Sequence, residues 1–290
     1  MKPPEKNIAC WEQLVSELQK LPQIDLACRG EERDFSGDME ARIDRCLDLR
    51  SNLRLRLRME TAVCQRFQEH APIYLSDVEQ RYLETRWLQL IVMQHYGVPT
   101  RLLDWTKSAW VAVFFAVFGA WESDGFVYGF RRDKLQQYLK QKFHSELNEL
   151  TWGQDPTDKR PPDNKWEQAE ANNILFNPEK TELLSDWVVT YYCRRAHFPR
   201  LVAQQGLFTF ASKPYLDHWK TITNFLADVD DCFVLRIQAA AKPGILRHLN
   251  NIGLNGATLF PGADGIGKSL EGFVRAWHLE PQPWQLQQSI

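Results

Sequence analysis

The segment Gln94–Thr106 (QHYGVPTRLLDWT) constrains the fold of this 290-residue chain more than any other. Apolar residues recur at helical spacing over 78–96, and Gly97 and Pro99 follow directly. Glycine adopts left-handed backbone geometry easily and proline cannot continue a helix. The pattern therefore predicts a helix over 78–96, a rigid turn after it, and a new element beyond.

The new element begins with a hydroxyl side chain. Thr106 or Ser108 stands before an apolar stretch over 109–120 that is rich in alanine. A serine or threonine oxygen at this position accepts a hydrogen bond from the first free backbone amides of a helix. We expect a buried helix here, capped by one of these two residues.

Between the two helices lie three polar residues, His95, Arg101 and Asp104. Taken singly, each has a structural explanation: an Arg101–Asp104 ion pair that braces the turn, and a core histidine with satisfied hydrogen bonds. Polar residues at this density between two apolar helices usually mark a site. We therefore interpret the cluster as part of a functional pocket.

The remaining elements are predicted from periodicity and turn residues. Helices are expected over 11–21, within 38–70 and over 243–249, and strands over 24–29, 126–130, 207–210 and 232–237. Over 53–58 leucine and arginine alternate, which could suit a strand; we favour a solvated face with leucines inward over a stripe that contacts phosphate. Without repeats or linkers, residues 1–290 are expected to form one α+β domain, with 1–22 as an N-terminal helical extension and 151–173 as a mobile loop.

Composition excludes some classes of protein. A net charge of -2 gives no overall positive field, although local basic patches remain compatible with nucleic acid. The six cysteines form no CxxC pair and no histidine cluster stands beside them, so no metal site is expected. The N-terminal sequence lacks the apolar core of a signal peptide, and the longest apolar run is too short to span a bilayer. A cytoplasmic protein without a membrane partner is expected.

A second short motif, Cys28-Arg29-Gly30-Glu31, ends a predicted strand. The planar fork of arginine suits bidentate binding of phosphate or carboxylate, and glycine lets a ligand approach the backbone. Alone, this motif is better explained by a surface ion pair.

Four segments, CRGE, QHYGVPTRLLDWTKSAWVAVFFA, PRLVAQQGLF and TLFPGADGIGKSLEG, occur in the order and spacing of the FRG family. The chain resembles this family from about residue 20 to 275, and the family looks like a divergent branch of the ADP-ribosyltransferase fold. The resemblance implies an ADP-ribosyltransferase-like split β-sheet core with surrounding helices. It also implies NAD as substrate, prokaryotic or phage defence or toxin–antitoxin settings, and nucleic acid (RNA favoured) or protein as acceptor.

The resemblance assigns roles to individual residues. Arg29 matches the arginine of an Arg–Ser–Glu pattern and would hold NAD phosphate or ribose, with the Gly30 backbone on the carboxamide. Thr106 and Ser108 match the second motif and would brace the site, while His95, Arg101 and Asp104 would shape its rim.

The third motif departs from the family pattern. Gln204 or Gln205 stands where a glutamate is usual, and a glutamine cannot serve as a general base. Asp104 is the first candidate for the missing carboxylate and Glu31 the second. The departure leaves open a binding or sensor module that does not turn NAD over.

Residues 262–269 (GADGIGKS) also fit the phosphate-binding P-loop pattern, and 257–260 resemble the strand that precedes such a loop. Only twenty-one residues follow, too few for the rest of a P-loop domain. We therefore interpret 259–262 and Gly265 as a structural turn, with Lys268 and Ser269 incidental. If the chain is a toxin, a neutralising antitoxin protein is expected as a partner.

Overall fold

The computed structural model describes residues 3–22, 25–35, 39–46, 52–83, 86–149, 175–191, 198–226 and 228–278. The loop expected over 151–173 lies outside the described residues.

Seven strands form one mixed sheet in the order β1-β7-β4-β2-β3-β6-β5. The strands are β1 (Glu5–Ile8), β2 (Leu26–Glu31), β3 (Leu102–Thr106), β4 (Gly125–Arg131), β5 (Val188–Tyr191), β6 (Gly206–Ala211) and β7 (Cys232–Ile237). β1 runs parallel to β7, and the other neighbours are antiparallel. Together with the helices, this sheet confirms the α+β class.

The sheet has few paired residues at its centre, and we call this place the narrow join. β2 pairs with β4 along its whole length, and β3 does the same with β6. Between β2 and β3, however, the only register pair is Cys28 with Thr106. The sheet therefore consists of two well-paired parts, β1-β7-β4-β2 and β3-β6-β5, that meet at a single residue pair.

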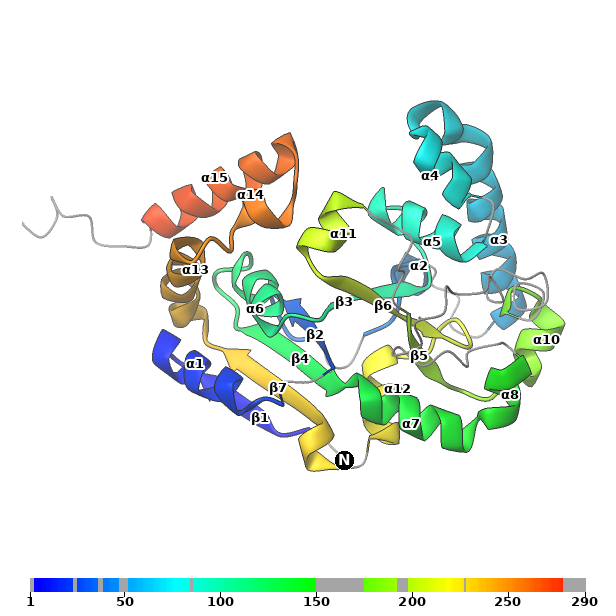
Figure 1. The fold of residues 1–290 in the computed structure, drawn as a ribbon, viewed down its shortest axis with the longest axis horizontal. Helices are drawn as coiled ribbons and strands as arrows, with labels where there is room; N and C mark the ends of the chain where they lie inside the picture. Colours follow the sequence, from blue (N-terminus) through cyan, green and yellow to red (C-terminus); the bar gives the residue numbers. More distant parts are fainter. Residues whose placement is uncertain are drawn as a thin grey trace, which may run out of the picture.

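Helices surround the sheet (Figure 1). They are α1 (Trp11–Lys20), α2 (Arg42–Cys46), α3 (Leu53–His70), α4 (Asp77–Tyr82), α5 (Arg86–His95), α6 (Ala109–Val117), α7 (Arg132–Lys142), α8 (His144–Glu149), α10 (Pro178–Leu183), α11 (Pro199–Ala203), α12 (His218–Phe225), α13 (Lys242–Asn251), α14 (Gly256–Leu259) and α15 (Ala263–His278). Figure 1 shows α13, α14 and α15 at one end of the molecule and α3, α4 and α10 at the other.

Strand alternation divides the core. Cys28, Val127 and Leu235 join α1, α6 and α13 in one buried cluster. Their neighbours in sequence, such as Ala27 and Tyr128, join α5, α7 and α12 in the other. Successive strand residues point to opposite faces, so the patterns of β2, β4 and β7 place helices on both faces of the sheet.

Helix α6 lies directly on the sheet. Ser108 is its N-cap, with the side-chain oxygen accepting a hydrogen bond from the Val111 amide, as the sequence allowed. A Cβ at Gly30 would lie 1.8 Å from the Ala112 carbonyl oxygen, and glycine is therefore required where the helix backbone meets β2. This contact fixes α6 beside the narrow join of the sheet.

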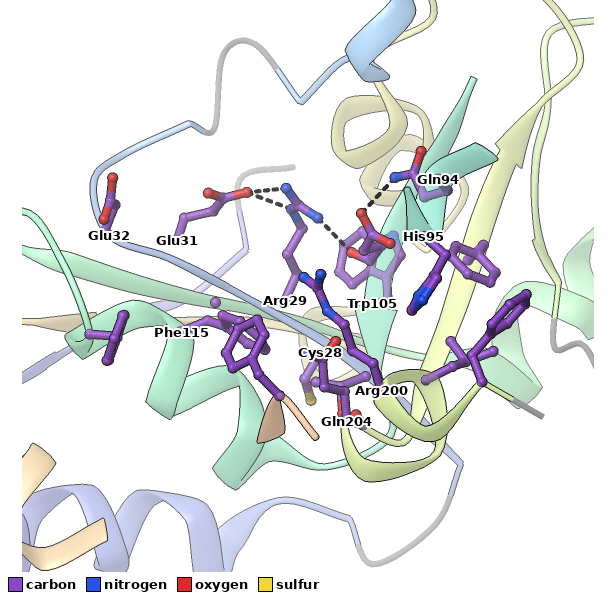
Figure 2. Close-up of a pocket in the computed structure, with 18 of the residues that line it drawn as sticks. Cys28, Arg29, Glu31, Glu32, Gln94, His95, Trp105, Phe115, Arg200 and Gln204 are labelled. Atoms are coloured by element: carbon purple, nitrogen blue, oxygen red, sulfur yellow. Dashed lines mark hydrogen bonds and ion pairs between the residues drawn. The ribbon is translucent and has the colours of Figure 1, made fainter. Parts of the chain in front are cut away.

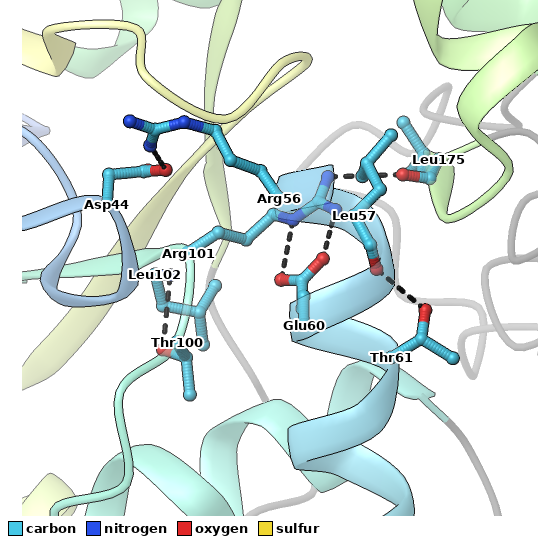
Figure 3. A network of polar contacts seen from close by, with 9 residues as sticks. All are labelled: Asp44, Arg56, Leu57, Glu60, Thr61, Thr100, Arg101, Leu102 and Leu175. Carbon is cyan, nitrogen blue, oxygen red and sulfur yellow. Dashed lines mark hydrogen bonds and ion pairs between the residues drawn. The ribbon is translucent and has the colours of Figure 1, made fainter. Parts of the chain in front are cut away.

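Two buried ion pairs hold α3 to the rest of the fold (Figure 3). Arg101 binds Glu60 through two nitrogens and donates a third hydrogen bond to the Leu175 carbonyl oxygen at 3.1 Å. Arg56 binds Asp44, and all four charged side chains are at most 3% exposed. The alternating segment 53–58 is thus helical, with Leu57 and Arg56 buried and Arg54 and Arg58 exposed.

Residues 257–260, which resemble the strand before a P-loop, lie mostly in α14. Two predictions are corrected by the structure. The described residues of 78–96 lie in two helices, α4 and α5, and not in one. The N-terminal segment 1–22 contributes β1 as well as a helix, and only Ile8 of that strand is buried, so it carries no period-two pattern. Short elements whose partners are distant in sequence leave little periodic signal.

Candidate functional site

A cavity of about 480 Å³ opens where β2 and β3 meet (Figure 2). Its lining comes from β2, β3, α5, α6, α11, β6 and the start of α15. The lining residues are Cys28, Arg29, Gly30, Glu31, Glu32, Phe35, Ile91, Gln94, His95, Asp104, Trp105, Thr106, Phe115, Phe118, Gly119, Phe198, Arg200, Leu201, Gln204, Phe208, Phe260 and Lys268. Of the predicted site residues, it brings together Arg29, Gly30, His95, Asp104, Thr106 and Gln204.

Arg29 projects from β2 into this cavity (Figure 2). Its guanidinium forms an ion pair with Glu31 at 2.5 Å and donates to the Asp104 main-chain carbonyl at 2.6 Å. The Arg29 side chain is 16% exposed, so it is held in place yet reachable from the cavity. A bidentate anion could replace Glu31 on this guanidinium.

Asp104 belongs to a second polar group. Its carboxylate accepts a hydrogen bond from the Gln94 side-chain nitrogen at 2.7 Å, and the Thr100 hydroxyl donates to the Gln94 side-chain oxygen Oε1. The carboxylate is exposed to solvent and is not paired with Arg101, whose guanidinium binds Glu60. The segment 94–104 thus folds back on itself and presents one carboxylate to the cavity.

Thr106 and Ser108 connect the second and third motifs. The Thr106 hydroxyl donates to the Gln204 carbonyl oxygen at 2.7 Å and accepts from the Ser108 amide at 3.0 Å. Thr106 lines the cavity, whereas Ser108 caps α6 and does not. The Thr106 side chain therefore binds the main chain of the third motif and holds β3 to the segment before β6.

The two glutamines differ in position. Gln204 lines the cavity and donates its side-chain amide to the Leu259 carbonyl oxygen at 3.0 Å. Gln205 adopts a left-handed backbone with φ of 48°, and its own carbonyl accepts from the Lys107 amide. Gln205 does not line the cavity, so its predicted site role is corrected to the turn that starts β6.

His95 lies flat against an aromatic ring in the cavity wall. It stacks on Phe198 with ring centroids 4.6 Å apart. Partial burial lowers the pKa of His95, and the positive charge of Arg200 lowers it further. His95 is therefore neutral at pH 7 and can donate or accept a hydrogen bond toward a ligand.

The assignment of Arg101 to the rim was wrong. Arg101 is 1% exposed, paired with Glu60, and stacked over the rings of Phe176 and Phe210. The three-residue spacing from Asp104 suggested a shared site, but strand residues an odd number apart point to opposite faces. Arg101 is a structural residue in the core.

The sequence reasoning missed cations and aromatic rings that line the cavity. Arg200 and Lys268 both do so, although Lys268 was interpreted as incidental. They lie in the third and fourth family-like segments, where attention to basic residues would have found them. Residues 263–269 are helical and follow a helix, so the strand–loop–helix geometry of a P-loop is absent from this described part of the chain.

No group of three or more metal-binding side chains occurs among the described residues. Within the same residues, no helix has the length and apolar character needed to cross a bilayer.

Residues 25–124 match the family model of the FRG domain. The matched range includes β2, α5, β3 and α6, and hence Arg29, Asp104 and Thr106. This match supports the resemblance to the FRG family, while Arg200, Gln204 and Lys268 lie beyond it. No curated protein and no solved structure matches the chain.

Proposed function

We propose that the cavity binds NAD and that the chain transfers ADP-ribose to an acceptor. One observation carries the proposal: Arg29, Thr106 and Gln204, which belong to three separate motifs, line the same cavity. Thr106 and Gln204 are hydrogen-bonded across 98 residues of sequence. Motifs so far apart gain a common function when the fold gathers them at one cavity.

The sheet supports this proposal. The strands that carry or directly follow the three motifs, β2, β3 and β6, are adjacent in the sheet order. The cavity lies at the narrow join between the two parts of the sheet, where a split-sheet ADP-ribosyltransferase core would hold NAD. The arrangement is what the family resemblance leads us to expect.

Each cavity residue has a chemical role in this proposal. Arg29 would leave Glu31 and bind the NAD diphosphate, as a guanidinium binds phosphate in two places at once. The Gly30 main chain would contact the nicotinamide carboxamide. Phe115, Phe118 and Phe208 offer apolar ring surfaces to the nicotinamide and adenine rings.

The reaction is a substitution at the ribose. The bond between C1′ and the nicotinamide nitrogen breaks, and its electron pair leaves with nicotinamide, which becomes neutral. The acceptor atom forms the new bond to C1′, and its proton passes to a carboxylate. The Gln204 amide cannot take this proton, so a carboxylate is needed. Glu31 and Asp104 both present carboxylates to the cavity.

We favour Glu31 as that carboxylate. The Glu31 carboxylate is paired with Arg29. Binding of the NAD phosphate to Arg29 would release Glu31 beside the ribose. Asp104 keeps its hydrogen bond to Gln94 in either case. This order of preference reverses the one drawn from the sequence alone.

A second candidate function is a module that binds a nucleotide without turning it over. Gln204 favours it, since its side-chain amide is bound to the Leu259 carbonyl and so has a structural role. Such a module predicts saturable NAD binding without release of nicotinamide.

We propose RNA as the favoured acceptor, with DNA or protein as the alternatives, and a toxin-like effect on a prokaryotic host. In that setting a neutralising antitoxin protein would be the partner. Growth inhibition on expression separates a catalytic toxin from a binding module.

The test uses NAD labelled on its adenine, incubated with the full chain and cellular RNA, DNA or protein. Label transfer with stoichiometric nicotinamide release is expected, and Arg29→Ala should slow it by about 10²–10³-fold. Arg81→Ala, an exposed arginine on α4, is the matched control and should keep full activity. Absence of transfer to all three acceptors, with no growth effect of the wild-type chain, would refute the enzyme.

The carboxylate is identified by Glu31→Gln and Asp104→Asn. Loss of a general base costs about 10²–10⁴-fold in rate. We expect a loss of this size in Glu31→Gln, with NAD binding retained. The opposite result, a large loss only in Asp104→Asn, would assign the role to Asp104.

A further inference from the structure

Two cations of the cavity wall lie over one buried phenylalanine ring. The Arg200 guanidinium carbon is 4.7 Å from the centroid of the Phe260 ring, and the Lys268 Nζ atom is 5.0 Å from it. Phe260 is 5% exposed, so its ring is a fixed support for the two cations. Cations over an aromatic face are attracted by its negative charge distribution.

The packing of α14 and α15 brings this pair together. A Cβ at Gly265 would lie 1.7 Å from the Phe260 carbonyl oxygen, and one at Gly256 would lie 2.6 Å from the Ser269 amide nitrogen. The two helices therefore touch backbone to backbone. This contact sets Lys268 beside Phe260 and explains the glycine at position 265.

Among the described residues, neither Arg200 nor Lys268 forms an ion pair with a carboxylate within 4.0 Å. The other cavity cation, Arg29, has Glu31. Asp264, an acidic residue of α15, acts electrostatically on His95. The wall formed by α11 and α15 thus has two positive charges that are not matched by close carboxylates.

Figure 2 shows the Arg200 side chain extending into the cavity that also holds Arg29, from the opposite wall. The two guanidinium groups belong to α11 and β2, on either side of the same space. An anion between them would be bound from two directions. Multiple phosphate groups satisfy this arrangement better than one carboxylate, because their charges are spread along the ligand.

We infer that Arg200 and Lys268, supported by Phe260, form a second group of phosphate-binding cations in the cavity, on the wall opposite Arg29. The inference deepens the proposed function, on which it rests for the identity of the ligand. Its phosphate belongs either to the NAD diphosphate or to the backbone of an acceptor strand. The chemistry is the same for both sources, and the experiment separates them.

Binding is measured by isothermal titration with three probes: inorganic diphosphate, NAD, and a short single-stranded RNA. The variants are Arg200→Ala and Lys268→Ala, with Lys220→Ala on α12 as a matched loss of one exposed charge away from the cavity. We expect each cavity variant to weaken diphosphate binding by about tenfold, as the loss of a charge-assisted hydrogen bond does. Lys220→Ala should bind like the wild type.

The other two probes identify the source of the phosphate. If NAD binding weakens and RNA binding does not, the site holds the NAD diphosphate. If RNA binding weakens alone, it holds the acceptor strand, and the slope of log affinity against log salt should fall by about 0.7 for each lost contact. Unchanged binding of all three probes in both variants would overturn the inference.

Charge-preserving variants guard against misfolding. Arg200→Lys and Lys268→Arg should retain most diphosphate binding, and thermal unfolding of every variant should match that of the wild type. If Lys and Arg replacements lose as much binding as alanine while folding normally, charge is not the cause and the inference fails. Diphosphate binding needs no NAD cleavage, so failure of the enzyme proposal and failure of this site are distinguishable.

Discussion

The buried arginines of the two α3 ion pairs and the cations of the cavity are all basic residues, but they lie in opposite environments. Arg101 and Arg56 are each 1% exposed and bound to a buried carboxylate. Arg29 is partly exposed, and Arg200 and Lys268 rest on an aromatic ring with no close carboxylate among the described residues. The first group has every charge satisfied by the protein, and the second has charge available for a ligand.

This difference teaches how a structural arginine and a binding arginine can be told apart within one fold. Both Arg29 and Arg101 lie in family-like motifs, Arg29 on β2 and Arg101 directly before β3. A buried charge is costly unless paired, so a buried pair marks a fixed part of the fold. A cation held in place without a full set of partners marks a site for an anion.

The largest effect is expected from Arg101→Ala. It would leave Glu60 buried without its partner, and removing one member of a buried pair costs about 3–5 kcal/mol. Urea denaturation should report a fall in the free energy of unfolding of this size. The double variant Arg101→Met with Glu60→Leu should recover much of it, and equal losses in both variants would argue against a buried ion pair.

Arg29→Ala should have the reverse profile. We expect loss of a transition-state contact worth about 10²–10³-fold in transfer rate, with a change in unfolding free energy well below that of Arg101→Ala. The paired measurement is label transfer from NAD and urea denaturation of the same preparation. A large stability loss with normal transfer per folded molecule would remove Arg29 from the site.

His218 extends the comparison to a buried group without any charged partner. Trp105 donates to the Thr209 hydroxyl, and that hydroxyl shares a hydrogen bond of 2.7 Å with Nδ1 of His218. Burial lowers the pKa of His218 to about 3, and the charge of Arg29 contributes. Between this value and the unfolded pKa of about 6.5 the unfolded state binds the extra proton, so stability falls as pH falls.

Between these two pKa values, the free energy of unfolding should change by up to about 1.4 kcal/mol per pH unit. Denaturation at a series of pH values should give a smaller slope in His218→Asn, whose amide oxygen can still accept from Thr209. The same slope in both proteins would contradict a neutral, buried His218.

The smallest effect concerns Cys28, which precedes Arg29 and points to the α6 side of the sheet. Burial raises the pKa of the Cys28 thiol to about 12, so iodoacetamide should not label it in the folded protein. Exposed Cys46 should react under the same conditions, as read by peptide mass spectrometry. Rapid labelling of Cys28 would contradict the burial of its thiol in the folded protein.

Long periodic or alternating segments were predictable from the sequence. α1, α6, α13, β4, β6 and β7 follow from spacing and capping residues, with Ser108 in the predicted capping position. The break between α4 and α5 and the edge strand β1 were not, because neither interrupts or creates a strong periodic pattern.

The site residues were predictable only where they lie inside a distinctive sequence motif. Arg29, Asp104 and Thr106 stand in distinctive segments, and Gln204 follows from its place before β6. The sequence did not predict that Arg200 and Lys268 lie over the same ring, because their positions depend on backbone contacts between α14 and α15. Arg101 was misplaced because sequence spacing does not reveal the distant partner Glu60.

The single pair between Cys28 and Thr106 has a consequence for how this chain can diverge. Beyond that pair, the main-chain groups of β2 and β3 do not bind one another, and the Asp104 carbonyl is bound by a guanidinium instead. Main-chain groups keep their chemistry whatever side chain they carry. The side chains around the cavity can therefore change while the main-chain opening between β2 and β3 stays the same.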